Sequence, residues 1–498
     1  MGFQYFRILG IGAMGLAVGG AGCLLPDYTG ADGVCEQGTP WTRQMGGSLV
    51  DVAFAAGSDP CGGVTMGGGV QGTVTFGPGV TVEADNKDLD GFITRLDARG
   101  NALWATSIGS SGQQVVSHVE TDFFGNAVAA GAFVGTLAPS GGPAITGEGD
   151  PNVSSGVMPG EKDAREYSTF VTKLDLLGAH LWTRALLGPT DMTSTTPCGV
   201  AVDRDGNVTI AGNFKGQVTI EGSTLGGDGD PSIFVVQYDE AGALRWNTIY
   251  STAAGAECNA FTADNDGNLL MTGAYRSAID FGDGPLPAPN TDGQRFFVVK
   301  LTPDGKIAWS DASTTGDGQG GSAITSDAQG NVFVAGSFLG FVNLGQGDVI
   351  SKGVLDLFVQ KRNSAGEIQW GKVFASAEGG LTVATVATLR ADPAGNVLLG
   401  GSIVGDLVLD KQLVANVGEP AMTDAFLARL SGSNGAPLAS RIFLGPGSQA
   451  LSGLAVDLEG WPIVVSWFSS SLDLGAGPGA LKADDFDLGT IFAAKFEL

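Results

Sequence analysis

The chain has 498 residues, 81 of them glycine, and its 26 basic residues are set against 52 acidic ones, which gives a formal net charge of −26. Hydrophobic residues make up 43% of the sequence, which excludes a disordered acidic chain because such chains lack the apolar residues for a core. The shortage of lysine and arginine excludes nucleic acid as an expected partner, since affinity for phosphate comes from those side chains.

The N-terminus has the composition of an export signal. Arg7 is its single early charge, and an apolar run rich in glycine and alanine follows as far as Cys23. A charged start, an apolar segment and small residues before a cleavage point are typical of a secretory signal peptide. The frequent small residues make the run a poor membrane-spanning helix. We therefore expect residues 1–22 to be a signal peptide and residues 23–38 to be a tether.

The residues around the expected cleavage point resemble a bacterial lipoprotein signal. Ala21 and Gly22 stand directly before Cys23 as in that family, whereas Gly20 departs from the pattern, in which leucine is usual at that position. The resemblance implies lipidation of Cys23 and a membrane partner reached through the lipid. The protein would then be an exported, membrane-anchored lipoprotein that faces the periplasm or the cell surface. Secretion without an anchor is the alternative.

The rest of the chain repeats one module. Tryptophan recurs at intervals of roughly 60 to 80 residues, a spacing that indicates a repeat architecture. A Gly-Asn turn recurs as well, between a run that ends in aspartate and an apolar run. The clearest turn segments are 124–131, 205–212, 266–273, 329–336 and 394–401. Degenerate copies at 64–77 and 461–475 bring the number of modules to seven.

Each module contains short β-rich runs bounded by glycine, asparagine and aspartate, which are strand and hairpin signals. The middle runs are almost continuously apolar, so both of their faces must be covered. Sheets that stand side by side in a propeller meet this requirement. We predict an all-β fold, a seven-bladed β-propeller of four-stranded antiparallel blades, that forms a single domain over residues 39–498.

The two ends of the chain predict how the ring closes. The last module has three strands, ending with Thr490–Phe496, and lacks the strand that carries tryptophan in the other modules. Trp41–Met45 stands alone before the first module and resembles the missing strand. Because an unpaired sheet edge is a liability, we expect the N-terminal strand to pair with Thr490–Phe496 and close the last blade.

The repeated Gly-Asn strand pair resembles the SBBP-type repeat of exported bacterial proteins, whose name refers to a seven-bladed β-propeller. The resemblance covers about residues 41–498 and implies the fold, while the repeat residues of that family are structural and imply no chemistry. The stretch from Asp97 to Trp104 also looks like the tryptophan-docking repeat of quinoprotein propellers, although the Gly-Asn strand pair does not belong to that pattern.

Five cysteines are present, and removal of Cys23 from the count leaves an even number, which in an exported protein suggests two disulfides. Cys198 and Cys258 begin the first strands of adjacent modules, so we expect them to pair near the centre of the ring. Cys35 and Cys61 then form the second pair by default. Buried free thiols are the alternative.

Candidate chemistry is sparse, and we assign no catalytic residue, no metal ligand and no cofactor. His118 and Glu120 lie two residues apart on a first strand, so they share a face that lines the expected channel. The aspartates before the Gly-Asn turns are expected to accept bonds from turn amides. Asp203 and Asp264 open sequences that resemble the start of a calcium loop, but no glutamate follows at the required spacing.

These observations predict a non-enzymatic envelope or surface lipoprotein, a monomer whose propeller is used for binding or scaffolding of a protein or glycan partner. The net charge would keep it soluble. The main alternative is a propeller enzyme, such as a hydrolase or lyase that acts on polysaccharide. A quinoprotein-like dehydrogenase is a further alternative.

Overall fold

The computed structural model describes residues 39–59, 61–84, 88–147, 167–188, 194–227, 231–290, 293–316, 318–376, 383–409, 412–414, 423–446, 449–474, 481–483 and 489–498. These residues form strands and turns and contain no helix, and therefore none that could cross a bilayer. The predicted signal peptide, the tether, Cys23 and Cys35 lie outside the described residues.

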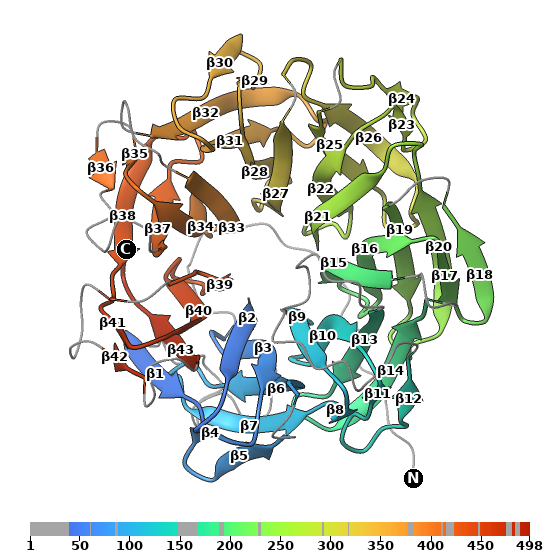
Figure 1. The fold of residues 1–498 in the computed structure, drawn as a ribbon, viewed down its shortest axis with the longest axis vertical. Helices are drawn as coiled ribbons and strands as arrows, with labels where there is room; N and C mark the ends of the chain where they lie inside the picture. The colour runs from blue at the N-terminus through green and yellow to red at the C-terminus, as the bar shows by residue number, and fades with distance from the viewer. Residues whose placement is uncertain are drawn as a thin grey trace, which may run out of the picture.

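Seven sheets of the described chain share one strand order and stand around a ring, so the prediction of an all-β propeller of antiparallel sheets is confirmed (Figure 1). We number the sheets 1 to 7 in chain order of their first strands. The first strands surround the central channel and are β2 (Asp51–Ser58), β9 (Gln114–Thr121), β15 (Ser194–Val202), β21 (Ala256–Ala263), β27 (Gln319–Ser326), β33 (Val383–Ala391) and β39 (Gly453–Val456).

The other strands of each sheet follow outward from the channel. The second strands are β3 (Val64–Val70), β10 (Ala127–Phe133), β16 (Val208–Lys215), β22 (Leu269–Tyr275), β28 (Val332–Phe338), β34 (Val397–Val404) and β40 (Pro462–Phe468). The third strands are β6 (Asp90–Leu96), β13 (Ser168–Leu174), β19 (Ser232–Tyr238), β25 (Arg295–Leu301), β31 (Asp356–Arg362), β37 (Asp424–Leu430) and β43 (Thr490–Lys495). The fourth, outermost strands are β7 (Ala102–Ser107), β14 (His180–Leu186), β20 (Leu244–Tyr250), β26 (Ile307–Ala312), β32 (Ile368–Ser376), β38 (Pro437–Phe443) and β1 (Trp41–Met45).

Short strands between the second and third strands of each sheet lie at the outside of the ring (Figure 1). They are β4 (Thr73–Gly77) with β5 (Val80–Glu83), β11 (Thr136–Leu137) with β12 (Ile145–Thr146), β17 (Gln217–Ile220) with β18 (Ser223–Gly226), β23 (Ile279–Asp280) with β24 (Pro285–Leu286), β29 (Phe341–Asn343) with β30 (Asp348–Ile350), β35 (Leu407–Leu409) with β36 (Gln412–Val414), and β41 (Ser471–Leu472) with β42 (Leu481–Lys482). β8 (Gly109–Ser111) pairs with β11, and β35 pairs with β32 of the preceding sheet. These contacts help to cover the exposed edges of the outer strands.

The N-terminal strand closes the ring as predicted. β1 pairs with β43 in antiparallel register, with Trp41 opposite Lys495 and Met45 opposite Ile491. The indole of Trp41 also donates to the carbonyl of Ala98 in sheet 1 at 3.0 Å. One short strand therefore completes sheet 7 and joins it to sheet 1.

The core lies between neighbouring sheets rather than in a single centre. One hydrophobic cluster, for example, joins Ala211 and Val235 of sheet 3 to Met271 and Phe297 of sheet 4, and clusters of the same kind fill the other junctions. This explains why the middle strands are apolar on both faces, since each face packs against a different sheet. Burial is complete or nearly so along strands such as β25.

An aspartate follows the first strand of each sheet and organises the turn; it is buried in every sheet but sheet 3, where Asp203 is half-buried. Oδ1 of Asp122 accepts the backbone N–H groups of Phe124 and Asn126, both at 2.9 Å, and its Oδ2 accepts the side chain of Asn126 at 2.8 Å. These bonds are the role that the sequence predicted for the aspartates. Gly125 between them has a φ of 84°, a conformation that favours glycine.

Six of these aspartates also pair with a cation from the third strand of their own sheet, a pairing that was not predicted from the sequence. Lys173 Nζ lies 3.0 Å from Asp122 Oδ2, and both side chains are almost fully buried. Sheet 3 is the exception, because Gln237 replaces the cation there. The other pairs are Asp59–Arg95, Asp264–Lys300, Asp327–Lys361, Asp392–Arg429 and Asp457–Lys495.

The recurring tryptophans connect a sheet to the next at six of the seven junctions, because the outer strand of sheet 6 has no tryptophan. Trp104 of sheet 1 donates to the carbonyl of Leu176 in sheet 2 at 2.9 Å, and its ring packs on Gly178. A side chain at Gly178 would collide with the indole, and its φ of 84° also favours glycine. The same bond to a turn carbonyl of the next sheet is made by Trp41, Trp182, Trp309 and Trp370. Trp246 packs on Gly305 but donates to Gln237 instead.

Removal of β1 should destabilise the ring. We compare a chain that begins at residue 37 with one that begins at residue 47, because both lack Cys35 and differ in the closing strand. The shorter chain should lose at least about 3 kcal/mol of unfolding free energy, the cost of removing one large buried side chain such as Trp41. Denaturant unfolding measures the difference, and equal stability of the two chains would contradict the closure.

Replacement of one buried cation should also destabilise the protein. Lys173→Met leaves Asp122 buried without its charge partner, which should lower the free energy of unfolding by about 3–5 kcal/mol. Lys306→Met is the matched control, because Lys306 pairs with Asp304 on the surface and is 80% exposed, so little change is expected. If both variants unfold at the same denaturant concentration as the wild type, the buried pairs do not stabilise the ring.

Candidate functional site

The first strands carry a bulge where they face the channel. The pairing with the second strand shifts by one residue near the middle of six first strands. A bulge redirects a side chain, and each extra residue lines the central cavity. These residues are Phe54, Ser117, Cys198, Asn259, Ser322 and Ala387.

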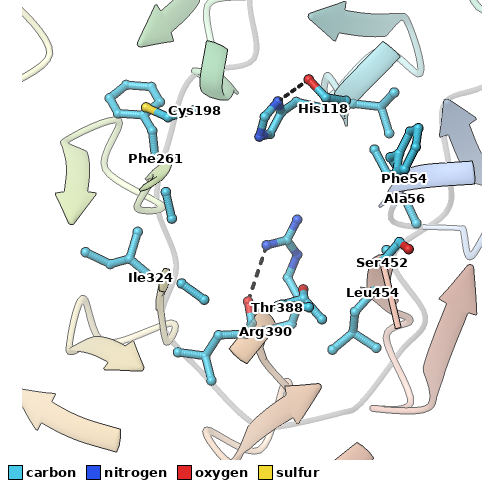
Figure 2. Close-up of a pocket in the computed structure, with 18 of the residues that line it drawn as sticks. Phe54, Ala56, His118, Cys198, Phe261, Ile324, Thr388, Arg390, Ser452 and Leu454 are labelled. Atoms are coloured by element: carbon cyan, nitrogen blue, oxygen red, sulfur yellow. Dashed lines mark hydrogen bonds between the residues drawn. The ribbon is translucent and has the colours of Figure 1, made fainter. Parts of the chain in front are cut away.

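The central cavity has a volume of about 230 Å³ and is lined by the first strands of all seven sheets. Most of its wall is small or apolar, as Ala323, Ile324 and Leu454 illustrate. Among the described lining residues, two carry charged side chains, Glu120 and Arg390, and one is a histidine, His118. Figure 2 shows the imidazole of His118 and the guanidinium of Arg390 directed into the cavity from different sheets.

We call these three side chains, which line one cavity, the channel triad (His118, Glu120 and Arg390). Nη2 of Arg390 lies 3.7 Å from Oε1 of Glu120, and the two side chains remain about one-third exposed. This separation is an ion pair but too long for a hydrogen bond. Nη1 of Arg390 donates to the carbonyl of Leu389 at 3.3 Å. The guanidinium therefore keeps N–H groups that face the cavity.

His118 is neutral near pH 7. Burial, and to a smaller extent the positive charge of Arg390, lowers the pKa of His118 to about 4. Burial raises the pKa of Glu120, and the nearby Arg390 opposes that rise. Nδ1 of His118 lies 2.9 Å from the hydroxyl of Ser117, so Nε2 is left to face a ligand.

Two members of the triad, His118 and Glu120, were predicted from the sequence to line the channel, whereas Arg390 was not. His118 and Glu120 line the cavity as expected from their shared face. Arg390 precedes Asp392 by two residues, as Glu120 precedes Asp122, so the two occupy equivalent positions in sheets 6 and 2. A comparison of this position across the modules would have found Arg390.

The turn aspartates are occupied by protein groups. Asp264 accepts Asn268 and pairs with Lys300 Nζ at 2.8 Å, and Asp203 accepts the side chain of Asn207 at 2.7 Å. Protein donors therefore surround the carboxylates that resemble a calcium loop. Within the described part of the chain, no group of three or more potential ligand residues could hold a metal ion.

One of the two expected disulfides is present. Cys198 of β15 is bonded to Cys258 of β21, which lie on the first strands of neighbouring sheets, with 5.8 Å between their Cα atoms. Cys61 is also disulfide-bonded, but its predicted partner Cys35 is outside the described residues, so that pairing stays a prediction. The sulfur of Cys198 faces the channel wall (Figure 2).

The channel wall differs from a glycosidase site. Such sites need two carboxyl groups that flank the scissile bond, and among the described lining residues Glu120 is the single carboxylate. The triad can instead offer donors from Arg390 and acceptors from Glu120 and the neutral His118. A pair of acceptors beside a fork of donors suits recognition of polar groups on a ligand.

Comparison with known proteins finds remote likenesses and leaves the activity open. No family model matches the chain. A stretch of 207 residues is 24% identical to an uncharacterized WD repeat-containing protein of Acanthamoeba polyphaga mimivirus, covering 34% of this chain and 15% of that protein. The chain thus spans a small part of the length of the curated relative it matches.

Solved structures with a similar arrangement are remote. The WD40 domain of Neurospora crassa Pan2 is 8% identical with a TM-score of 0.40, covering 92% of this chain and 97% of that one. A quinohemoprotein alcohol dehydrogenase from Comamonas testosteroni is 9% identical with a TM-score of 0.42, covering 91% and 76%. The polysaccharide lyase Uly1 is 10% identical with a TM-score of 0.40, covering 90% and 91%. Likenesses this remote say nothing about activity.

The titration of His118 tests the geometry of the triad. NMR of the imidazole should give a midpoint near pH 4, and Arg390→Met should raise it, because the variant removes a positive neighbour. His180→Gln isolates the signal, since the chain has two histidines. The unfolded chain binds this proton near pH 6.5, so His118 should reduce stability as the pH falls from about 6.5 to 4. A midpoint near 6.5 would contradict this environment.

Proposed function

We propose that this protein is an exported lipoprotein of the cell envelope whose propeller binds a ligand and performs no catalysis. The channel triad supports the binding role, because its hydrogen-bond donors and acceptors face a cavity whose other lining residues are uncharged. The repeated Asp–cation pairs and tryptophan contacts support it too, since they hold the wall rigid and reduce the cost of ordering a site when a ligand binds.

The enzyme alternatives have less support from the cavity. A glycoside hydrolase of the usual kind needs two carboxyl groups at the reacting bond, and Glu120 is the single carboxylate among the described lining residues. The quinoprotein-like alternative is based on the resemblance of the tryptophan strands. Those tryptophans bond to the neighbouring sheet, which is a structural role and gives no support for catalysis. We therefore place binding first.

Two parallel measurements test this function. The full chain is screened for binding against envelope glycans and short peptides, and for turnover of the same glycans and of alcohols with quinone acceptors. The proposal expects saturable binding with no turnover. Product formation that Glu120→Gln or His118→Asn abolishes would overturn it in favour of an enzyme.

The anchor is a separate part of the proposal. Signal-peptide cleavage should make Cys23 the first residue, and intact-mass measurement of the exported protein should show an added diacyl or triacyl group. Cys23→Ser should remove that mass and release the protein from membranes, because a lipid chain supplies the membrane affinity. An unmodified Cys23 in the exported wild type would contradict lipidation.

A further inference from the structure

The charges of the channel triad balance, which limits what the cavity can accept. Arg390 carries one positive charge, Glu120 beside it carries one negative charge when ionised, and His118 is neutral near pH 7. The other described lining residues are uncharged. A ligand with a net charge would leave an unbalanced charge in a partly buried site, which is unfavourable. A ligand with no net charge fits better.

The ion pair between Arg390 and Glu120 also favours neutral ligands over zwitterions. A free amino acid would place its ammonium on Glu120 and its carboxylate on Arg390, and so separate charges that lie 3.7 Å apart. The amino acid would also have to lose water from two charged groups of its own, which costs more than removing water from hydroxyl groups. A pair of adjacent hydroxyl groups needs no such separation, because each hydroxyl both accepts and donates. One hydroxyl group can accept a hydrogen bond from Arg390 while the adjacent hydroxyl group donates to Glu120 or to Nε2 of His118.

The size and wall of the cavity agree with a single sugar ring. Its volume of about 230 Å³ is below the ~300–1,000 Å³ of sites for drug-sized ligands. Phe54 and Phe261 contribute to the wall, and Asn259, Ser322 and Ser452 add polar groups around it. Polar groups beside a few apolar ones suit a ligand rich in hydroxyl groups, since each hydroxyl both donates and accepts.

We propose that the central channel binds one neutral sugar unit through adjacent hydroxyl groups, with Arg390 as donor and Glu120 and His118 as acceptors. This inference rests on the proposed binding function and names its ligand class. The sugar can be a free monosaccharide or the terminal unit of a glycan, since both present the same hydroxyl pair.

Calorimetric titration of the full chain in detergent tests the proposal, with a panel of methyl hexosides and pentosides as probes and free amino acids as competitors. At least one glycoside should bind, and Arg390→Met and Glu120→Gln should each weaken it roughly 10- to 100-fold, the effect of losing a hydrogen bond to a charged group. Lys306→Met should leave the affinity unchanged. The His118 imidazole signal should shift on binding.

The outcomes separate this inference from the proposed function. An oligosaccharide that ends in the preferred unit and binds as tightly as the glycoside identifies a glycan terminus, whereas its exclusion identifies a free sugar, and both support the proposal. Preference for amino acids, or glycan binding that the two triad variants leave intact, overturns the sugar site but not the binding function. Absence of binding by every glycoside overturns the sugar site as well.

Discussion

The ring depends on one repeated constraint, the need to pair a buried charge. Each first strand ends in an aspartate whose carboxylate organises the following turn, and a buried carboxylate is costly unless a cation compensates it. Lys300 meets that need for Asp264 from the third strand of the same sheet. Trp309 stands directly opposite Lys300 on the outer strand and bonds to the next sheet. Paired residues of one module therefore connect the aspartate turn, the sheet itself and the contact with the next sheet.

This arrangement explains why the channel triad stands out. Where the module is regular, the position two residues before the turn aspartate is small or weakly polar, as Ala201 and Thr325 show. Glu120 and Arg390 break that pattern in two sheets and meet across the cavity. Their charges contribute nothing to the turns or to the sheet junctions. Residues that depart from the pattern of the module without stabilising the fold are candidates for a functional role.

The repeat made most of the fold predictable from the sequence, because seven copies of one pattern specify strands, turns and sheet order together. The pairing of β1 with β43 followed from the missing last strand, and the bond between Cys198 and Cys258 followed from their equivalent positions. The bulges were not predictable, because they depend on the register between strands rather than on residue type. Arg390 was missed although it occupies the same position before its turn aspartate as Glu120. The lysines and arginines of the third strands recur in the sequence, but their aspartate partners could be identified only from the structure, which brings the two together.

The central claim is that charges inside the sheets maintain the ring while charges in the channel serve a ligand. Two arginines of sheet 6 test it directly, since Arg429 pairs with Asp392 inside the sheet and Arg390 faces the cavity. The measurement is the unfolding free energy of Arg429→Met and Arg390→Met in the absence of ligand. We expect a large loss of stability for Arg429→Met, because it leaves a buried carboxylate unpaired, and little change for Arg390→Met. A loss for Arg390→Met as large as that for Arg429→Met would contradict it.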